Sequence, residues 1–200
     1  MIVLVQLDGS VSAEFQQASK ADKVAFIEAF ALAARKTPEL RTAQIVDYVV
    51  RTVAVRDQEE EVRTAAQRAL AQLAGLGPTI GALIREAIAA TAGDDAPEHE
   101  RAARQKTFQA LFKAAPALIE APFVAETAGL AATDPDLEVR RQAQQTLGVM
   151  LHARSELAAE AFAVVEHAWS DPARPYARKG AQRTLCKIVE VCPERAPQAV

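Results

Sequence analysis

Two similar stretches decide the fold of this chain: EVRTAAQRAL at residues 61–70 and EVRRQAQQTL at residues 138–147. A third copy, ARKGAQRTL, occupies residues 177–185, and weaker copies lie at 24–32 and 103–111. Successive copies begin 38, 41, 36 and 38 residues apart, at the anchor positions Val24, Val62, Ala103, Val139 and Ala177. A near-constant period of this length predicts a chain built from one repeated structural unit.

Each copy has the pattern of an amphipathic helix, with apolar residues three or four positions apart, as in Val62, Ala66, Leu70 and Leu73. The punctuation that follows the copies (Pro38, Pro78, Pro116 and Ser155) predicts that a second helix starts there, because proline is tolerated in a first helical turn. Pro122 should kink or delay the second helix of the third unit. A helical hairpin this small cannot bury its apolar stripe alone, so neighbouring hairpins should stack on one another.

A second pattern accompanies the first helices: an aspartate, four residues, Val-Arg, and then alanine and leucine. It appears from Asp57 to Leu70 and from Asp134 to Leu147. Over about residues 18–193 the chain resembles the HEAT-repeat family. The resemblance implies an all-α fold, a right-handed α-α superhelix or HEAT-like solenoid of about four and a half helical hairpins. It also implies that arginines form a ladder with the aspartates between neighbouring units, a role expected for Arg63, Arg104, Arg140 and Arg178.

The two ends of the chain depart from the repeat. Residues 2–9, IVLVQLDG, have the pattern of a short extended segment and a turn, so residues 1–17 are expected to form an extended cap or to add to a partner. Residues 18–193 form the repeat domain. Residues 194–200 are a tail too short for another helix, and this missing half-unit predicts an open C-terminal end that could join a homo-oligomer or a partner.

Composition narrows the class of protein. The chain has 44 alanines, only 5% aromatic residues, 24% charged residues and a net charge of -3, which indicates a folded protein and argues against a strongly basic nucleic-acid binder. No stretch reaches the roughly 18 apolar residues that a membrane span needs. Cys186 and Cys192 would lie about 9 Å apart along a helix, too far for a disulfide, which fits a cytoplasmic protein with reduced cysteines.

Catalytic motifs are not apparent in the sequence. The glycines form no phosphate-binding loop, and no serine has a neighbouring histidine that could serve as a base. Three scattered histidines, His99, His152 and His167, do not have the spacing of metal ligands. We therefore expect no enzyme activity, no cofactor and no metal. A HEAT-like enzyme stays as a third alternative, which would need a bound metal or a deep polar pocket.

The charges separate between the two kinds of helix. Toward the C-terminus the expected second helices carry glutamates and no lysine or arginine, whereas the first helices are basic. In HEAT-like proteins the second helices line the concave face. We expect a non-enzymatic protein-binding scaffold or adaptor whose concave groove takes a protein partner, including a basic one. The expected groove residues are Gln44, Asp47, Tyr48, Arg51, Arg85, Glu120, Glu126, Glu156, Glu160 and His167.

Nucleic-acid binding by the basic first-helix face is the alternative function. Phosphate contacts there would make binding strongly dependent on salt. The residues expected to carry it are Arg174, Arg178, Lys179, Arg183 and Lys187. The interpretation that both charged faces are simply solvated and bind no partner also stays open.

Overall fold

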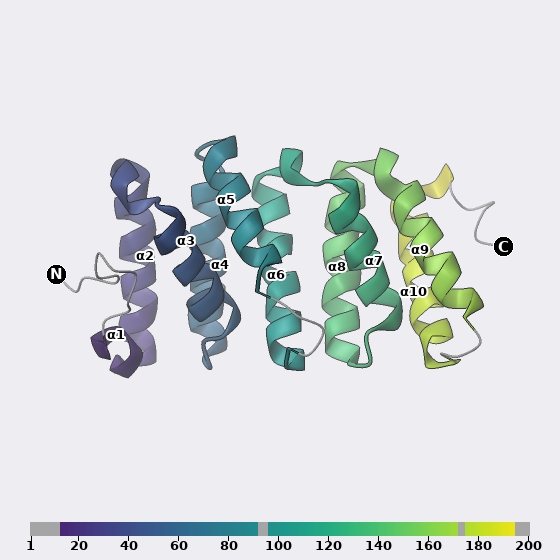
Figure 1. The fold of residues 1–200 in the computed structure, drawn as a ribbon, viewed down its shortest axis with the longest axis horizontal. Helices are drawn as coiled ribbons and strands as arrows, with labels where there is room; N and C mark the ends of the chain where they lie inside the picture. Colours follow the sequence, from purple (N-terminus) through teal and green to yellow (C-terminus); the bar gives the residue numbers. More distant parts are fainter. Residues whose placement is uncertain (1–12, 92–95, 172–174, 195–200) are drawn as a thin grey trace.

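The computed structural model describes residues 13–91, 96–171 and 175–194. Throughout these residues the secondary structure is helical, with no strand, so the predicted all-α class is confirmed. Figure 1 shows the helices side by side in a row along the long axis, with α1 and α10 at opposite ends of the row. Within the described part of the chain, no helix is both long enough and apolar enough to cross a membrane.

One layer of the row consists of the predicted first helices. These are α2 (Lys20–Lys36), α4 (Glu60–Ala74), α6 (Glu98–Ala114), α8 (Leu137–Ala153) and α10 (Pro175–Val191). From α2 to α8, each of these first helices packs closely on the next first helix: α2 on α4, α4 on α6 and α6 on α8. The last helix differs, because α10 packs chiefly against α7 and α9 of the other layer and less against α8.

The second layer lies in front of the first in Figure 1. Its members are α3 (Ala43–Tyr48), which continues as the π-helical segment η2 (Val49–Val55), then α5 (Pro78–Ala89), α7 (Ala121–Thr133) and α9 (Ala158–Ser170). Short 3-10 turns precede three of them: η1 (Pro38–Leu40), η3 (Pro116–Leu118) and η4 (Ser155–Leu157).

Several second helices begin later than the prolines predict. Pro78 starts α5 as expected, but Pro38 and Pro116 start 3-10 turns. The helix α3 begins only after Thr42, whose hydroxyl accepts a hydrogen bond from the Ile45 N–H at 3.3 Å. Pro122 stands in the first turn of α7, so the predicted delay of that helix is confirmed.

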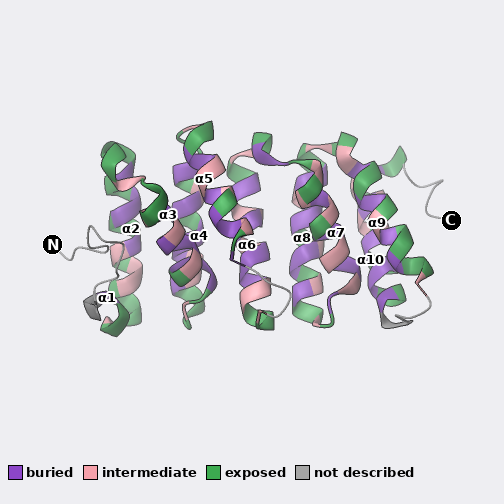
Figure 2. Ribbon diagram, viewed as in Figure 1, coloured by how far each residue is buried: buried purple, intermediate pink, exposed green. Residues whose placement is uncertain are grey.

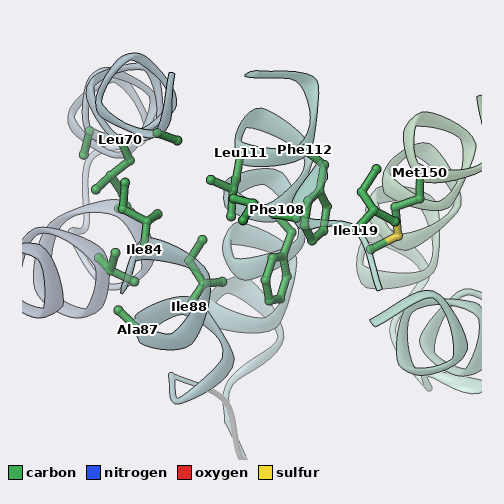
Figure 3. Close-up of a cluster of buried hydrophobic side chains, with 14 of the residues drawn as sticks. Leu70, Ile84, Ala87, Ile88, Phe108, Leu111, Phe112, Ile119 and Met150 are labelled. Atoms are coloured by element: carbon green, nitrogen blue, oxygen red, sulfur yellow. The ribbon is translucent and has the colours of Figure 1, made fainter. Parts of the chain in front are cut away.

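Buried residues run along the facing sides of the two layers (Figure 2). The predicted stripes are confirmed, since Val62, Ala66, Val139 and Ala143 are each 0% exposed. In the middle of the row, Phe108 and Phe112 stack with ring centroids 5.4 Å apart. Figure 3 shows them between residues of α5 and residues from the following unit, so the core is continuous along the row. Because one core joins the helices, the core also fixes how the surface side chains of neighbouring helices lie relative to one another.

The N-terminal prediction is only partly within the described residues. Residues 1–12 of the expected extended cap lie outside them, and residues 13–17 form the short helix α1 (Ala13–Gln17) instead of extended chain. Phe15 of α1 is buried, and its ring packs edge-on against Phe26 of α2 at 5.7 Å. The described part of this segment, residues 13–17, is therefore helical, and it covers apolar surface on α2. In the expected C-terminal tail, residues 195–200 lie outside the described residues.

Candidate functional site

The arginines of the repeated motif close their own turns. Arg63 Nη1 donates to the carbonyls of Asp57 at 2.6 Å and Gln58 at 3.1 Å. Two repeats later, Arg140 Nη1 makes the equivalent hydrogen bonds to the carbonyls of Asp134 at 2.6 Å and Pro135 at 3.0 Å. These side chains satisfy backbone groups just before α4 and α8. The expected pairing of these arginines with the motif aspartates is therefore wrong.

The motif aspartates do join neighbouring units, but through other cations. Asp57 pairs with Lys23 of α2 at 3.1 Å. Asp134 accepts two hydrogen bonds from Arg101 of α6, both at 3.0 Å, and its side chain is only 3% exposed. The hydrogen bonds that Arg101 donates to Asp134 raise the pKa of the Arg101 guanidinium. The ladder thus runs from the preceding first helix to the next turn.

Arg104 has a different role from its counterparts. Its side chain is buried, and it donates from Nε to the Ile88 carbonyl at 3.2 Å and from Nη2 to the Ala89 carbonyl at 3.4 Å. It also lies over the Phe108 ring and pairs with Glu126. Because helix C-termini leave carbonyls without intrahelical partners, Arg104 caps α5 and does not belong to a ladder.

The expected acidic groove on the second layer is partly neutralised by arginines. The pairs are Arg85–Glu120, Arg104–Glu126 and Arg154–Glu156. The hydrogen bond from Arg154 lowers the pKa of Glu156 below its usual range. Glu160 and His167 are exposed on α9 and form no ion pair with any described residue. Uncompensated negative charge remains on this side at Glu86 of α5 and at Glu160 and Glu166 of α9.

In the first unit, three of the four expected groove residues line a groove of about 470 Å³ between α3 and α5. They are Gln44, Asp47 and Arg51, and the last two pair with each other at 2.6 Å. The expectation that Tyr48 belongs to this surface is wrong. Tyr48 is 9% exposed because its side of α3 faces the core, and burial raises its pKa to about 12.

Ion pairs join the first helices along most of the row. Lys20 of α2 pairs with Glu61 of α4 at 2.8 Å, and Lys106 of α6 pairs with Glu60 of α4 at 3.1 Å. The Arg101–Asp134 pair follows between α6 and the turn before α8. Each of these three junctions therefore brings opposite charges together.

The junction between α8 and α10 brings like charges together. Arg140, Arg141, Lys179 and Arg183 line a groove of about 460 Å³ there; we call these four residues the basic cluster. Among the described residues, no ion pair crosses from α8 to α10. The one described carboxylate that forms an ion pair with a residue of the basic cluster is that of Glu138, which lies 4.0 Å from Arg141 on the same helix. Four positive charges with so little compensation create a strong attraction for an anion.

A larger groove of about 890 Å³ follows on the same side, one to two turns further along α8 and α10. Its lining includes apolar groups from three first helices: Phe112, Gly148, Val149 and Val191. Within this groove Lys187 lies over Gly148, since a Cβ on Gly148 would be only 3.0 Å from Lys187 Cε. We call the two grooves together the furrow. Its first half is basic and its second half has an apolar floor.

A glycine explains why the layer opens at this junction. A Cβ on Gly180 would lie 2.2 Å from the carbonyl oxygen of Ala132, in the last turn of α7. Only glycine allows α10 to approach α7 so closely. The helix lies close to the second layer at this point, and it packs less extensively on α8 than the other first helices pack on one another.

The sequence predicted some of the residues that line the basic half of this furrow. Of the residues expected to bind nucleic acid, Lys179, Arg183 and Lys187 line it, Arg178 is exposed outside it, and Arg174 lies outside the described residues. Arg141, Gln144 and the apolar half were missed. Aligning the repeats offers one signal, because Arg140-Arg141 and Arg178-Lys179 occupy equivalent positions in successive copies and so fall on adjacent helices.

Comparison with known proteins adds no relative. No protein-family model matches the chain, and no curated protein sequence matches it.

Proposed function

We propose that this protein is a non-enzymatic scaffold with a HEAT-like, right-handed solenoid architecture, and that it holds a protein partner in the furrow between α8 and α10. The row of helical hairpins and the repeated Asp…Val-Arg motif support the architecture. The proposal keeps the expected class of function but moves the binding surface from the second helices to the first.

One observation carries the proposal. The basic cluster has little compensation beside a groove of about 890 Å³, whereas opposite charges meet at the preceding junctions of the first layer. Like charges held together cost stability in the free protein, by a few tenths of a kcal/mol for each close pair. A bound anionic group removes this cost, so the arrangement favours a partner with negative charge.

The acidic side of the second layer has a weaker basis. Its glutamates 120, 126 and 156 already have arginine partners within the chain. A basic partner would have to replace those contacts, and exchanging one ion pair for another contributes little free energy. Nucleic acid is the second candidate, because phosphates would also bind the basic cluster.

The test is affinity capture from a lysate of the native host with three forms of the protein. The first is the wild type. The second carries Arg141→Glu, Lys179→Glu and Arg183→Glu, which leaves out Arg140 because that side chain closes the turn before α8. The third carries Arg35→Glu, Lys36→Glu and Arg68→Glu, three exposed cations on α2 and α4 that form no ion pair with described residues. Both triple variants change the net charge by the same amount.

We expect a protein that is retained by the wild type and by the α2/α4 variant but lost with the furrow variant, with or without nuclease treatment. Circular dichroism of the three forms checks that all are equally helical. Equal retention by the furrow variant would refute the proposed surface. Retention that depends on the furrow and disappears with nuclease would assign the function to nucleic-acid binding instead.

A further inference from the structure

We infer that the occupant of the furrow is an extended peptide segment of the partner that carries acidic side chains at one end and a bulky apolar side chain about four residues away. This inference rests on the proposed function and deepens it, because it specifies the chemistry of the bound segment. It follows from the two unlike halves of the furrow and from the distance between them.

The first half selects negative charge. Lys179 and Arg183 are exposed and form no ion pair with any described residue, and Arg141 has only the distant contact with Glu138. Arginine can bind a carboxylate through two parallel hydrogen bonds, which adds direction to the attraction. One carboxylate would leave most of the basic cluster uncompensated, so at least two acidic side chains are expected.

The second half selects an apolar group. Val149 of α8 and Val191 of α10 are half-buried in the lining of the groove, so part of their hydrocarbon surface is open to it beside the buried Gly148. This half carries less net positive charge than the first, because Lys187 is held by Glu190 at 3.0 Å, and Lys113 is the lysine of its lining that has no ion pair among the described residues. Burial of apolar surface therefore contributes to affinity here beside the attraction of Lys113.

The spacing of the two groups follows from helix geometry. Arg183 in the basic half and Val191 in the apolar half are eight positions apart on α10, which corresponds to about 12 Å along the axis. An extended chain advances about 3.3 Å per residue, so about four residues cover the distance.

An extended segment fits the width of the furrow better than a helix does. The helices α8 and α10 still pack on each other along the furrow, whereas a helix with its side chains is about 10–12 Å wide. A bound helix would rest on the ridges of α8 and α10, and its side chains would reach the floor only in part. An extended peptide can lie between the ridges.

The lining also favours a peptide over a nucleic acid. Single-stranded nucleic acids gain much of their affinity by stacking bases on exposed aromatic rings. The aromatic residue that lines the furrow is Phe112, which is 0% exposed and already stacked on Phe108. The apolar half therefore offers a pocket for a side chain but no platform for a base.

The experiment is selection from a phage-displayed library of random 12-residue peptides on the wild-type protein, after removal of phage that bind the Arg141→Glu/Lys179→Glu/Arg183→Glu variant. We expect the selected peptides to share two or more acidic residues and a bulky apolar residue three to five positions away. Selected sequences are then synthesised with a fluorescent label, and their affinities are measured by anisotropy.

The two halves are tested separately with these labelled peptides. The furrow triple variant should weaken binding at least tenfold, and the α2/α4 triple variant should leave it unchanged. Gly148→Leu, which fills the apolar half, should weaken it at least fivefold, and Gly148→Ala should have a smaller effect in the same direction. Gly129→Ala on α7 is the matched control, since its Cβ meets only Val164 Cγ1 at 3.7 Å.

Three results would overturn the inference: no shared acidic and apolar motif, affinities unchanged by both Gly148 variants, or a labelled 12-nucleotide single strand that binds more tightly than every selected peptide. The capture experiment separates these failures from failure of the proposed function. A protein partner retained through the furrow, with no such peptide motif, leaves the scaffold function standing and refutes only the extended acidic-apolar segment.

Discussion

Replacing Gly180 with alanine tests the contact that opens the furrow. The new Cβ would lie 2.2 Å from the Ala132 carbonyl oxygen and 3.0 Å from the Ala132 carbonyl carbon. Ordinary contacts between non-bonded carbons are about 3.5–4.0 Å, so α10 would have to withdraw from α7 by about 1 Å. The atoms in the way are backbone atoms, which cannot rotate aside as a side chain can.

Two effects of opposite sign set the magnitude. Overpacking a well-packed site costs about 1–3 kcal/mol, and rigid backbone places this site toward the upper end. Alanine in place of glycine inside a helix contributes about 1 kcal/mol in favour of folding. The expected net loss is about 1–2 kcal/mol of unfolding free energy, or a fall in Tm of about 2–8 °C for a chain of this size.

The assay is urea denaturation followed by circular dichroism, with two other glycine-to-alanine variants as controls. Gly129→Ala meets ordinary contact distances, and Gly148→Ala meets only the flexible end of Lys187. Neither control should be less stable than the wild type by more than about 0.5 kcal/mol, because both gain helix propensity. If Gly180→Ala proves as stable as these controls, α10 does not lie so close to α7, and the explanation for the open furrow is wrong.

Three further substitutions test other contacts. Asp134→Ala leaves the Arg101 guanidinium without its two carboxylate hydrogen bonds and should cost about 2–4 kcal/mol in urea denaturation; a double-mutant cycle with Arg101→Ala that gives a coupling below about 0.5 kcal/mol would contradict this. Arg104→Met should cost about 2–3 kcal/mol by the same measurement, because it keeps the aliphatic stem and removes the cap of α5; an unchanged midpoint would exclude the capping role. Tyr48 has a folded pKa of about 12, above the usual value of 10.0, so its contribution to stability is full below pH 10 and is lost as the pH rises through 12, by up to about 3 kcal/mol. Tyr48→Phe should be at least as stable as the wild type at pH 7, since the buried hydroxyl has no hydrogen-bond partner among the described residues, and it should flatten the decline above pH 10; an unchanged slope would argue against burial of the hydroxyl.

The helices could be predicted because their signal is local. A stripe such as Val62, Ala66 and Leu70 records which side of a helix is buried, and that information does not depend on which neighbour covers it. The repeat spacing then places the helices in order. The starts of the second helices were less accurate, because Pro38 and Pro116 are equally compatible with a 3-10 turn and with a first α-helical turn.

The partners of the charged residues could not be predicted because they depend on distances between units. Arg63 and Arg104 occupy equivalent motif positions, yet one reaches the carbonyls of its own turn and the other reaches the end of α5. Glu120 and Glu126 of the second layer read as free acidic charge in sequence, but Arg85 and Arg104, which pair with them, come from other helices. The furrow depends on one contact at Gly180, which has no sequence signature of its own.

The uneven distribution of ion pairs along the row has a consequence for how the molecule opens. In an array whose members touch mainly their neighbours, the free energy of opening depends on each junction separately, and an end unit with a weak junction frays first. Repulsion across α8 and α10 makes α10 that unit, so its amide protons should exchange with solvent sooner than those of α4 or α6. A ligand that neutralises the basic cluster would then hold α10 against α8 and slow amide hydrogen exchange throughout α10, including at residues that the ligand does not touch.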